Sequence, residues 1–254
     1  MYSIPTSLNP SDKFSGITLS AGNLSLVNSG RGLARSYSKA GSGKWYVEFT
    51  RVGDTKWMGG LALAAESLAN YPGATNNSIG LYEGSVYVNN AVVATVANLN
   101  NTGVFGMAID MGARTVRFFD ADATTAAITI PGSGDVFLAC GNGNTPLPSG
   151  SMSLNAGQSA FAYSVPSGFT SGFALRDVYG INGTVLDAAG APAARTVRAF
   201  LRSSGALMGE VVSNGTTGAY RLIPEPNSTA ALTVEFLPNS TSENAIIFDR
   251  VVPA

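Results

Sequence analysis

Acidic side chains are the main candidates for chemistry in this chain of 254 residues, because histidine is absent and Cys140 is the single cysteine. Without histidine, the chain can build neither a Ser-His-Asp triad nor a histidine-ligated metal site. One thiol also excludes an intrachain disulfide and a thiolate zinc site. Cys140 follows the apolar residues 136–139, which predicts a buried core residue rather than a nucleophile.

Three aspartates are the candidates for metal binding. Asp120 and Asp122 could give two oxygens to Ca²⁺, with Asp110 one strand away. A calcium site needs about six oxygen ligands that converge in one loop. Capping of turns by these carboxylates is the alternative role. We therefore expect no bound metal.

Two further patterns are typical of enzymes. Glycoside cleavage needs two acids about 5 to 9 Å apart across a groove. Glu48 lies on one face of an apolar strand and Glu83 begins a turn, and neither has an acidic partner on the same face. Residues 41–44 (Gly-Ser-Gly-Lys) are similar to part of a phosphate-binding loop but lack its first glycine and its helix, which predicts a β-turn. We expect a non-enzymatic protein, without catalytic residues or cofactor.

Aromatic side chains near polar turns are the candidates for binding. Tyr71, Tyr82 and Tyr87 lie in or next to such turns, so their rings could be presented on a rim and stack on sugars or peptides. Packing at the rim, with the hydroxyl in water, is the alternative. Trp45 and Trp57 belong to predicted strands and are expected in the core.

Short strands must position these side chains. Hydrophobic residues make up 45% and charged residues only 12%, with 30 Gly and 12 Pro, which favours strands joined by tight turns. Residues 104–109 alternate in apolar character, and residues 115–119 resume the alternation after a break, which predicts a β-hairpin. Gly106 and Ala108 indicate that a backbone or a large side chain lies close to that face. Asn89 and Asn90 predict the turn of another hairpin.

Four segments resemble, in the same order, the motifs of SPRY domains. They are residues 43–49 (Gly-Lys-Trp-Tyr-Val-Glu-Phe), 78–84 (Ser-Ile-Gly-Leu-Tyr-Glu-Gly), the hairpin at 104–120, and 154–169, which contains Asn-Ala-Gly-Gln and Pro-Ser-Gly-Phe. The resemblance implies a two-sheet β-sandwich that binds partners and has no catalytic residues. Residues 154–169 together with 8–13 look most like SPRY modules of tailed-phage structural proteins. Asp-Ala-Asp at 120–122 departs from the more usual Asn-Gly turn of the family.

A second domain is expected after a boundary near residues 172–179. Residues 180–193 (Gly-Ile-Asn-Gly-Thr-Val-Leu-Asp-Ala-Ala-Gly-Ala-Pro-Ala) resemble the first hairpin of transthyretin-like or carboxypeptidase-regulatory-like domains, which are small sandwiches. Residues 244–253 also look like the end of such modules in phage virion proteins. The sequence thus predicts an all-β chain of two tandem antiparallel β-sandwiches. These are a SPRY-like, concanavalin-like sandwich at 15–172 and a transthyretin-like or Ig-like one at 178–254, preceded by an N-terminal arm at 1–14.

The function implied by the resemblance is structural. We expect a component of a tailed-phage virion, such as a fibre, decoration or tail-associated protein, assembled in the host bacterial cytoplasm. It would be an oligomer that contacts other virion proteins and copies of itself. A module for host attachment that binds a cell-surface glycan or protein is the alternative. The net charge of −1 predicts no nucleic-acid surface, and we expect neither a secretory leader nor membrane insertion.

Overall fold

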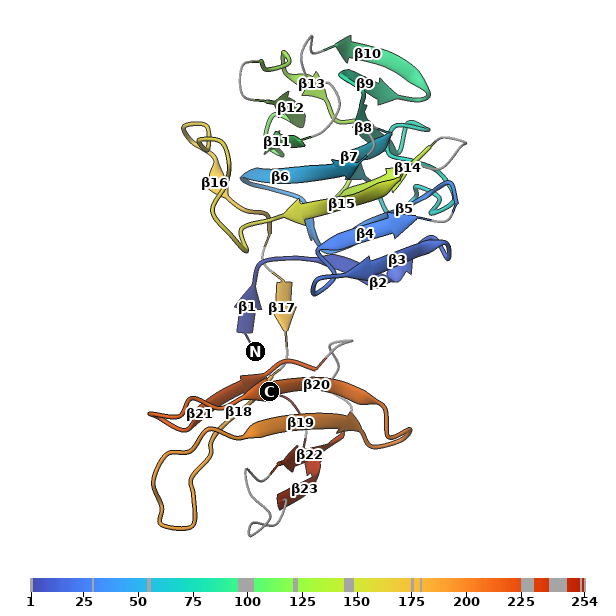
Figure 1. Ribbon diagram of the computed structural model, residues 1–254. Helices are drawn as coiled ribbons and strands as arrows, with labels where there is room; N and C mark the ends of the chain where they lie inside the picture. The colour runs from blue at the N-terminus through green and yellow to red at the C-terminus, as the bar shows by residue number, and fades with distance from the viewer. Residues whose placement is uncertain are drawn as a thin grey trace. The chain divides into compact units, whose positions relative to one another are not determined.

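The computed structural model describes most of the chain, with its elements shown in Figure 1. The described residues are 2–28, 30–53, 56–95, 103–120, 123–143, 149–174, 176–178, 180–224, 231–237, 246–251 and 253. Every regular element in these ranges is a β-strand, and none of these ranges contains a helix suited to crossing a membrane. The chain divides into one unit at Pro5–Arg176 and a second at Asp177–Ala254 that also includes Met1–Ile4.

The first unit contains a seven-stranded antiparallel sheet in the order β10-β9-β8-β7-β14-β5-β2. Its strands are β2 (Leu8–Lys13), β5 (Gly32–Ala40), β7 (Trp57–Ala62), β8 (Ser78–Tyr82), β9 (Ser85–Val88), β10 (Ala91–Thr95) and β14 (Val136–Asn142).

The other sheet of this unit has the order β13-β12-β11-β6-β15-β4-β3, and β16 (Thr170–Ser171) pairs in parallel with β6. Its remaining strands are β3 (Ile17–Ser20), β4 (Ser25–Asn28), β6 (Lys44–Gly53), β11 (Gly103–Asp110), β12 (Thr115–Phe119), β13 (Ile128–Thr129) and β15 (Gly150–Asn155).

Large apolar side chains fill the space between the two sheets. Trp57 and Phe49 are fully buried, and the rings of Phe49 and Phe105 stack with centroids 5.2 Å apart. A Cβ at Gly59 of β7 would lie 2.6 Å from the side chain of Met152 in β15. The absence of a side chain at Gly59 therefore lets the sheets pack closely at this point.

The predicted hairpin at 104–119 is confirmed. β11 and β12 are antiparallel, with Ile109 opposite Val116. A Cβ at Gly106 would lie 2.2 Å from the hydroxyl of Tyr46. The small residue in this strand therefore accommodates a large side chain, as its pattern predicts.

The second unit consists of two smaller antiparallel sheets. One pairs β18 (Ile181–Thr184) with β21 (Ala219–Leu222), and the other has the order β20 (Leu207–Val212), β19 (Thr196–Leu201), β22 (Leu232–Phe236) and β23 (Ile246–Val251). Val197, Ala199, Leu222, Leu232 and Val234 belong to its apolar core. The predicted all-β class with two tandem β-sandwiches is confirmed.

The segment expected as an arm at 1–14 forms strands instead. β1 (Tyr2–Ile4) pairs with β17 (Arg176–Val178), and β2 pairs with β5. Leu8 is fully buried, and Asp12 forms an ion pair with Arg35 of β5 at 2.7 Å. Residues 5–14 therefore belong to the first unit, although their polar sequence shows no strand alternation.

Candidate functional site

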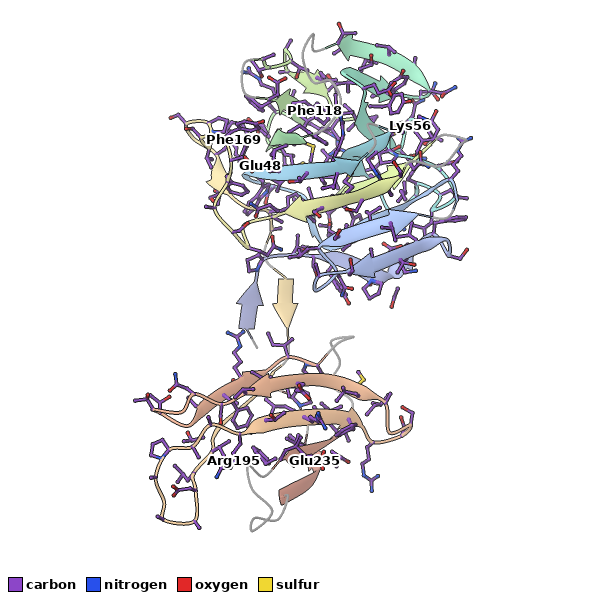
Figure 2. The ribbon with its side chains drawn as sticks, viewed as in Figure 1. Glu48, Lys56, Phe118, Phe169, Arg195 and Glu235 are labelled. Atoms are coloured by element: carbon purple, nitrogen blue, oxygen red, sulfur yellow. The ribbon has the colours of Figure 1, made fainter. Side chains whose placement is uncertain are left out.

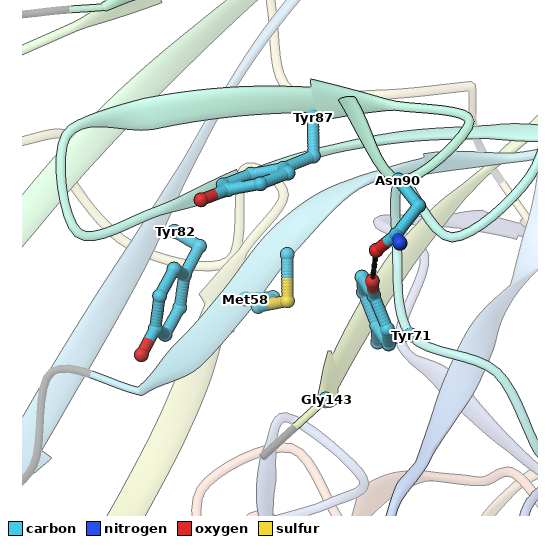
Figure 3. A pocket seen from close by; sticks show the side chains of 6 residues that line it. All are labelled: Met58, Tyr71, Tyr82, Tyr87, Asn90 and Gly143. Carbon is cyan, nitrogen blue, oxygen red and sulfur yellow. Dashed lines mark hydrogen bonds between the residues drawn. The ribbon is translucent and has the colours of Figure 1, made fainter. Parts of the chain in front are cut away.

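A pocket of about 200 Å³ lies in the first unit (Figure 3). Its lining comprises Met58, Tyr71, Tyr82, Tyr87, Asn90 and Gly143. The structure thus brings all three tyrosines singled out from the sequence to one site. Each of them is half-buried. Their role in recognition stays a prediction.

The strand register places one wall of the pocket on the outer face of the seven-stranded sheet. Gly59 faces the other sheet, so the preceding Met58 points to the opposite side. Gly59 pairs with Leu81, which sets Met58 beside Tyr82. Tyr87 on β9 is the diagonal neighbour of Tyr82, and the two rings meet edge to face with centroids 6.1 Å apart.

Two tight turns determine where these side chains lie. Glu83 and Gly84 connect β8 to β9 with φ of 43° and 75°. Asn89 and Asn90 connect β9 to β10 with φ of 49° and 60°, which confirms the predicted hairpin turn. Positive φ at both central residues matches the twist of antiparallel strands. The second turn brings the Asn90 side chain to the rim of the pocket (Figure 3).

The opposite wall comes from the connection between β7 and β8 at residues 63–77. A Cβ at Gly80 of β8 would lie 2.3 Å from the carbonyl oxygen of Pro72, and a Cβ at Gly143 would lie 2.6 Å from the Tyr71 ring. Glycine at both positions lets Tyr71 and Pro72 lie directly on the sheet. The Tyr71 hydroxyl then donates a hydrogen bond to Oδ1 of Asn90.

The buried carboxylate of Glu66 holds this connection together. Its Oε1 accepts hydrogen bonds from the Ser67 backbone N–H at 3.1 Å and the Asn70 side chain at 2.7 Å. Its Oε2 accepts from the hydroxyls of Thr75 and Ser78, both at 2.6 Å. Four donors on one buried carboxylate fix the path of the chain around the pocket. Glu66 was not among the candidates that the sequence suggested, because its partners are spread over residues 67–78.

Arg35 anchors the start of the same connection. Its Nη1 donates to the carbonyl oxygens of Leu63 and Ala64, both at 2.8 Å. Its Nε and Nη2 form a bidentate pair with Asp12 at 2.8 and 2.7 Å. Paired guanidinium contacts of this kind are geometrically specific. Contacts within the chain therefore hold this wall of the pocket in place.

Charged groups border the pocket but do not line it. The Arg31 guanidinium lies 4.7 Å from the centroid of the Tyr71 ring. Arg51 of β6 is buried on the inner side of β8 and donates to the Leu81 carbonyl oxygen at 3.4 Å. Burial lowers the pKa of Arg51 to about 10, against the opposing effect of Glu83, so the group stays protonated at neutral pH.

The carboxylate of Glu48 has a structural role (Figure 2). It is buried and accepts hydrogen bonds from the backbone N–H groups of Ala162 and Tyr163, both at 2.8 Å. The Tyr46 hydroxyl donates to the same group at 3.1 Å, and burial together with Glu48 raises the pKa of Tyr46 above its usual range. Glu48 therefore fastens residues 154–169 to β6.

The aspartates considered for calcium cap turns where the structure describes them. Asp110 accepts from the Ala113 N–H at 2.9 Å and pairs with Lys44 at 2.8 Å. Asp120 accepts from the Ala123 N–H at 2.7 Å, whereas Asp122 lies outside the described residues. The described parts of the chain contain no cluster of three or more acidic or cysteine side chains that could hold a metal ion.

The burial predicted for Cys140 and Trp57 is confirmed, and the core position predicted for Trp45 is confirmed in part. Cys140 and Trp57 are fully buried. Trp45 is half-buried and packs edge to face against Phe173, with ring centroids 6.1 Å apart. Residues 41–43 form a bend, with a φ of 86° at Gly43, and strand β6 follows them in place of the helix of a phosphate-binding loop.

No protein-family model and no curated protein matches the sequence. Solved structures similar to the chain include the SPRY domain of human HERC1, at 14% identity and a TM-score of 0.49 over 61% of this chain and 100% of that one. Another is the PSpry domain of TRIM65, at 13% identity and a TM-score of 0.47 over 59% of this chain and 92% of that one.

Stonustoxin is a third similar structure, at 16% identity and a TM-score of 0.48 over 59% of this chain. The match spans 27% of the stonustoxin chain. The fold class of the chain rests on its own strand order, which is all-β with two sandwiches.

Proposed function

We propose that this chain is a non-enzymatic structural component of a tailed-phage virion, namely a fibre, decoration or tail-associated protein that acts by binding. The assignment to a virion rests on the resemblance of residues 8–13, 154–169 and 244–253 to segments of phage structural proteins. It includes a transthyretin-like identity for residues 178–254. The partners are other virion proteins and copies of the chain, which assemble in the host bacterial cytoplasm.

The observation that carries a binding role is the convergence of Tyr71, Tyr82 and Tyr87 on one pocket. A tyrosine offers an apolar ring and a polar hydroxyl together, which suits a surface that binds partners. Glu66 and Arg35 hold the wall of the pocket in place. A preformed site supports binding because little chain entropy is lost when the partner docks.

A scaffold held by buried polar contacts supports the same role. Two of the segments that resemble SPRY motifs are joined by Glu48, which links β6 to the backbone of Ala162 and Tyr163. Binding residues are commonly carried by connections on such a scaffold. The connection at 63–77 and the two turns beside it fit this arrangement.

The pocket also favours a second candidate, the recognition of a glycan or protein on the host cell. Its volume of about 200 Å³ suits one ring-sized group rather than an extended protein surface. A virion component can carry such a site on its exposed face. The two candidates therefore differ in the partner that occupies the pocket.

Purified particles of the phage that encodes the chain test the virion assignment. Antibodies against the chain, used for immunogold electron microscopy on density-purified particles, should label one repeated location. Mass spectrometry of the same particles should find the chain in multiple copies, and light scattering should give the purified chain a multiple of 26.0 kDa. A chain abundant in the lysate but absent from purified particles would contradict the proposal.

The two candidates are separated by a binding assay with labelled protein. A structural component should rebind particles stripped of the chain and should ignore host cells. A receptor-binding module should bind host cells saturably, and the variant Tyr82→Ala should lose that binding.

A further inference from the structure

We propose that the pocket lined by Tyr71, Tyr82 and Tyr87, called the tyrosine pocket below, binds one neutral pyranose ring of a glycan. The tyrosine rings would pack against the sugar, and polar groups at the rim would form hydrogen bonds with its hydroxyls. This inference rests on the second candidate above, recognition of the host surface, and names the ligand class.

The size and shape of the pocket fit a single sugar ring. The rings of Tyr71, Tyr82 and Tyr87 surround Met58, which is buried and lies between them (Figure 3). The volume of about 200 Å³ is below the roughly 300 to 1,000 Å³ of sites for drug-sized ligands. Aromatic faces pack against the C–H face of a pyranose, so the walls suit the apolar side of a sugar.

Polar groups at the rim suit the hydroxyls of a sugar. Oδ1 of Asn90 already accepts from Tyr71, which orients the amide and leaves its Nδ2 to donate elsewhere. Among the described residues, neither this Nδ2 nor the Tyr87 hydroxyl has a hydrogen-bond partner. An apolar peptide side chain would remove both groups from water without offering them a hydrogen bond, which lowers the free energy gained on binding.

The charges around the pocket favour a neutral ligand. None of the lining residues is charged, so an anion inside the pocket would lose its hydration without an ion pair to the lining, and Arg31 lies outside that lining. A cation would meet the guanidinium of Arg31, which lies 4.7 Å from the centroid of the Tyr71 ring. This like charge opposes the cation binding that three aromatic rings would otherwise allow.

Binding of small probes to the full chain tests the ligand class. Saturation-transfer NMR and calorimetry would use the methyl pyranosides of glucose, galactose, mannose and N-acetylglucosamine. Methyl glucuronide, choline and N-acetylprolinamide would represent anionic, cationic and peptide-like ligands. We expect at least one neutral pyranoside to bind with a Kd of about 1 mM, and the other three probes to bind at least about tenfold more weakly.

Matched variants locate the binding. Tyr87→Ala removes a ring face and should abolish the signal, and Asn90→Asp keeps the side-chain shape but loses the amide donor, for a loss of about tenfold. Tyr220→Phe changes a half-buried tyrosine of the second unit and should bind like the wild type. Thermal unfolding of each variant verifies that it is folded, so Asn90→Asp remains informative if Tyr87→Ala does not fold.

Three results would overturn the inference. The first is that no neutral pyranoside binds. The second is that a charged or peptide-like probe binds as strongly as the pyranosides or more strongly. The third is that Tyr87→Ala and Asn90→Asp both still bind the pyranoside as the wild type does. None of them bears on whether the chain is present in purified particles. Absence from particles would overturn the virion assignment and leave the measured sugar binding in place.

Discussion

The hydroxyl of Tyr71 donates a hydrogen bond to Oδ1 of Asn90, and this contact joins the connection at 63–77 to the β9–β10 turn (Figure 3). The two segments form opposite walls of the tyrosine pocket. The contact fixes both the ring of Tyr71 and the direction of the Asn90 amide. The pocket therefore depends on contacts between walls as well as on the sheet beneath it.

Tyr71→Phe tests this contact alone. The substitution keeps the ring but removes the hydrogen bond, which is exposed, so we expect a loss of at most about 1 kcal/mol in the free energy of unfolding. Tryptophan fluorescence during urea unfolding measures the effect, because Trp45 and Trp57 both lie in the first unit. A loss above about 3 kcal/mol would mean that the hydroxyl has a larger structural role.

Glu66→Ala tests the network beneath the wall. It leaves four hydrogen-bond donors without their acceptor, so we expect the first unit to lose at least about 3 kcal/mol. Asp135→Ala is the matched control in the same unit, because its ion pair with Lys39 is largely exposed, and it should cost less than about 1 kcal/mol. Equal effects of the two substitutions would contradict the role assigned to Glu66.

Gly80→Ala tests how closely the connection lies on the sheet. The new Cβ would lie 2.3 Å from the Pro72 carbonyl oxygen, so the wall must move outward. We expect a loss of about 1 to 3 kcal/mol together with weaker binding in the pocket. Gly112→Ala is the control, because its new Cβ would come no closer than 3.3 Å to Asp110. If Gly80→Ala binds as strongly as the wild type, binding in the pocket does not depend on the close contact between Gly80 and Pro72.

Asp110 gives a prediction for the effect of pH. The Lys44 ammonium, followed by the Ala113 N–H, lowers the pKa of Asp110 below its usual value. A carboxylate with a depressed pKa in the folded state stabilises the protein above its unfolded pKa of about 4, and this contribution disappears as pH falls through the folded pKa.

Asp110→Asn removes that contribution. We expect the variant to be less stable than the wild type at pH 7, and the difference in unfolding free energy to shrink as the pH falls below about 4. Urea unfolding at several pH values measures the difference. A difference that stays constant down to pH 2 would rule out the ion pair as its source.

The strands and tight turns were predictable because their signals are local. Alternation at 104–119 sets which side chains of a strand face the core, and Asn89 and Asn90 tolerate the positive φ that their turn requires. The strand β2 escaped prediction because Leu8–Lys13 is polar, contains a proline and lies at the edge of its sheet. Pairing with β5 and the Asp12–Arg35 contact, rather than alternation, define it.

The site was predictable only in part. Tyr71, Tyr82 and Tyr87 stand out because they lie next to polar turns, but their meeting in one pocket depends on register and on a connection that folds back over β8. Glu66 gave no separate signal because its partners are spread over residues 67–78. Hydrogen bonds of this kind depend on the folded path of the chain, which no local pattern encodes.

Binding of the fluorescently labelled chain to cells of the phage's host, measured by flow cytometry for the wild type and Tyr82→Ala, tests the central claim most directly. The claim is that the tyrosine pocket recognises the host surface, which is the second candidate function and the basis of the inferred sugar site. It predicts saturable binding by the wild type that free neutral pyranoside displaces, and no saturable binding by the folded variant. Equal binding by both proteins would contradict this claim. No saturable binding by the wild type would also contradict it, and would leave the first candidate, a structural component that ignores host cells.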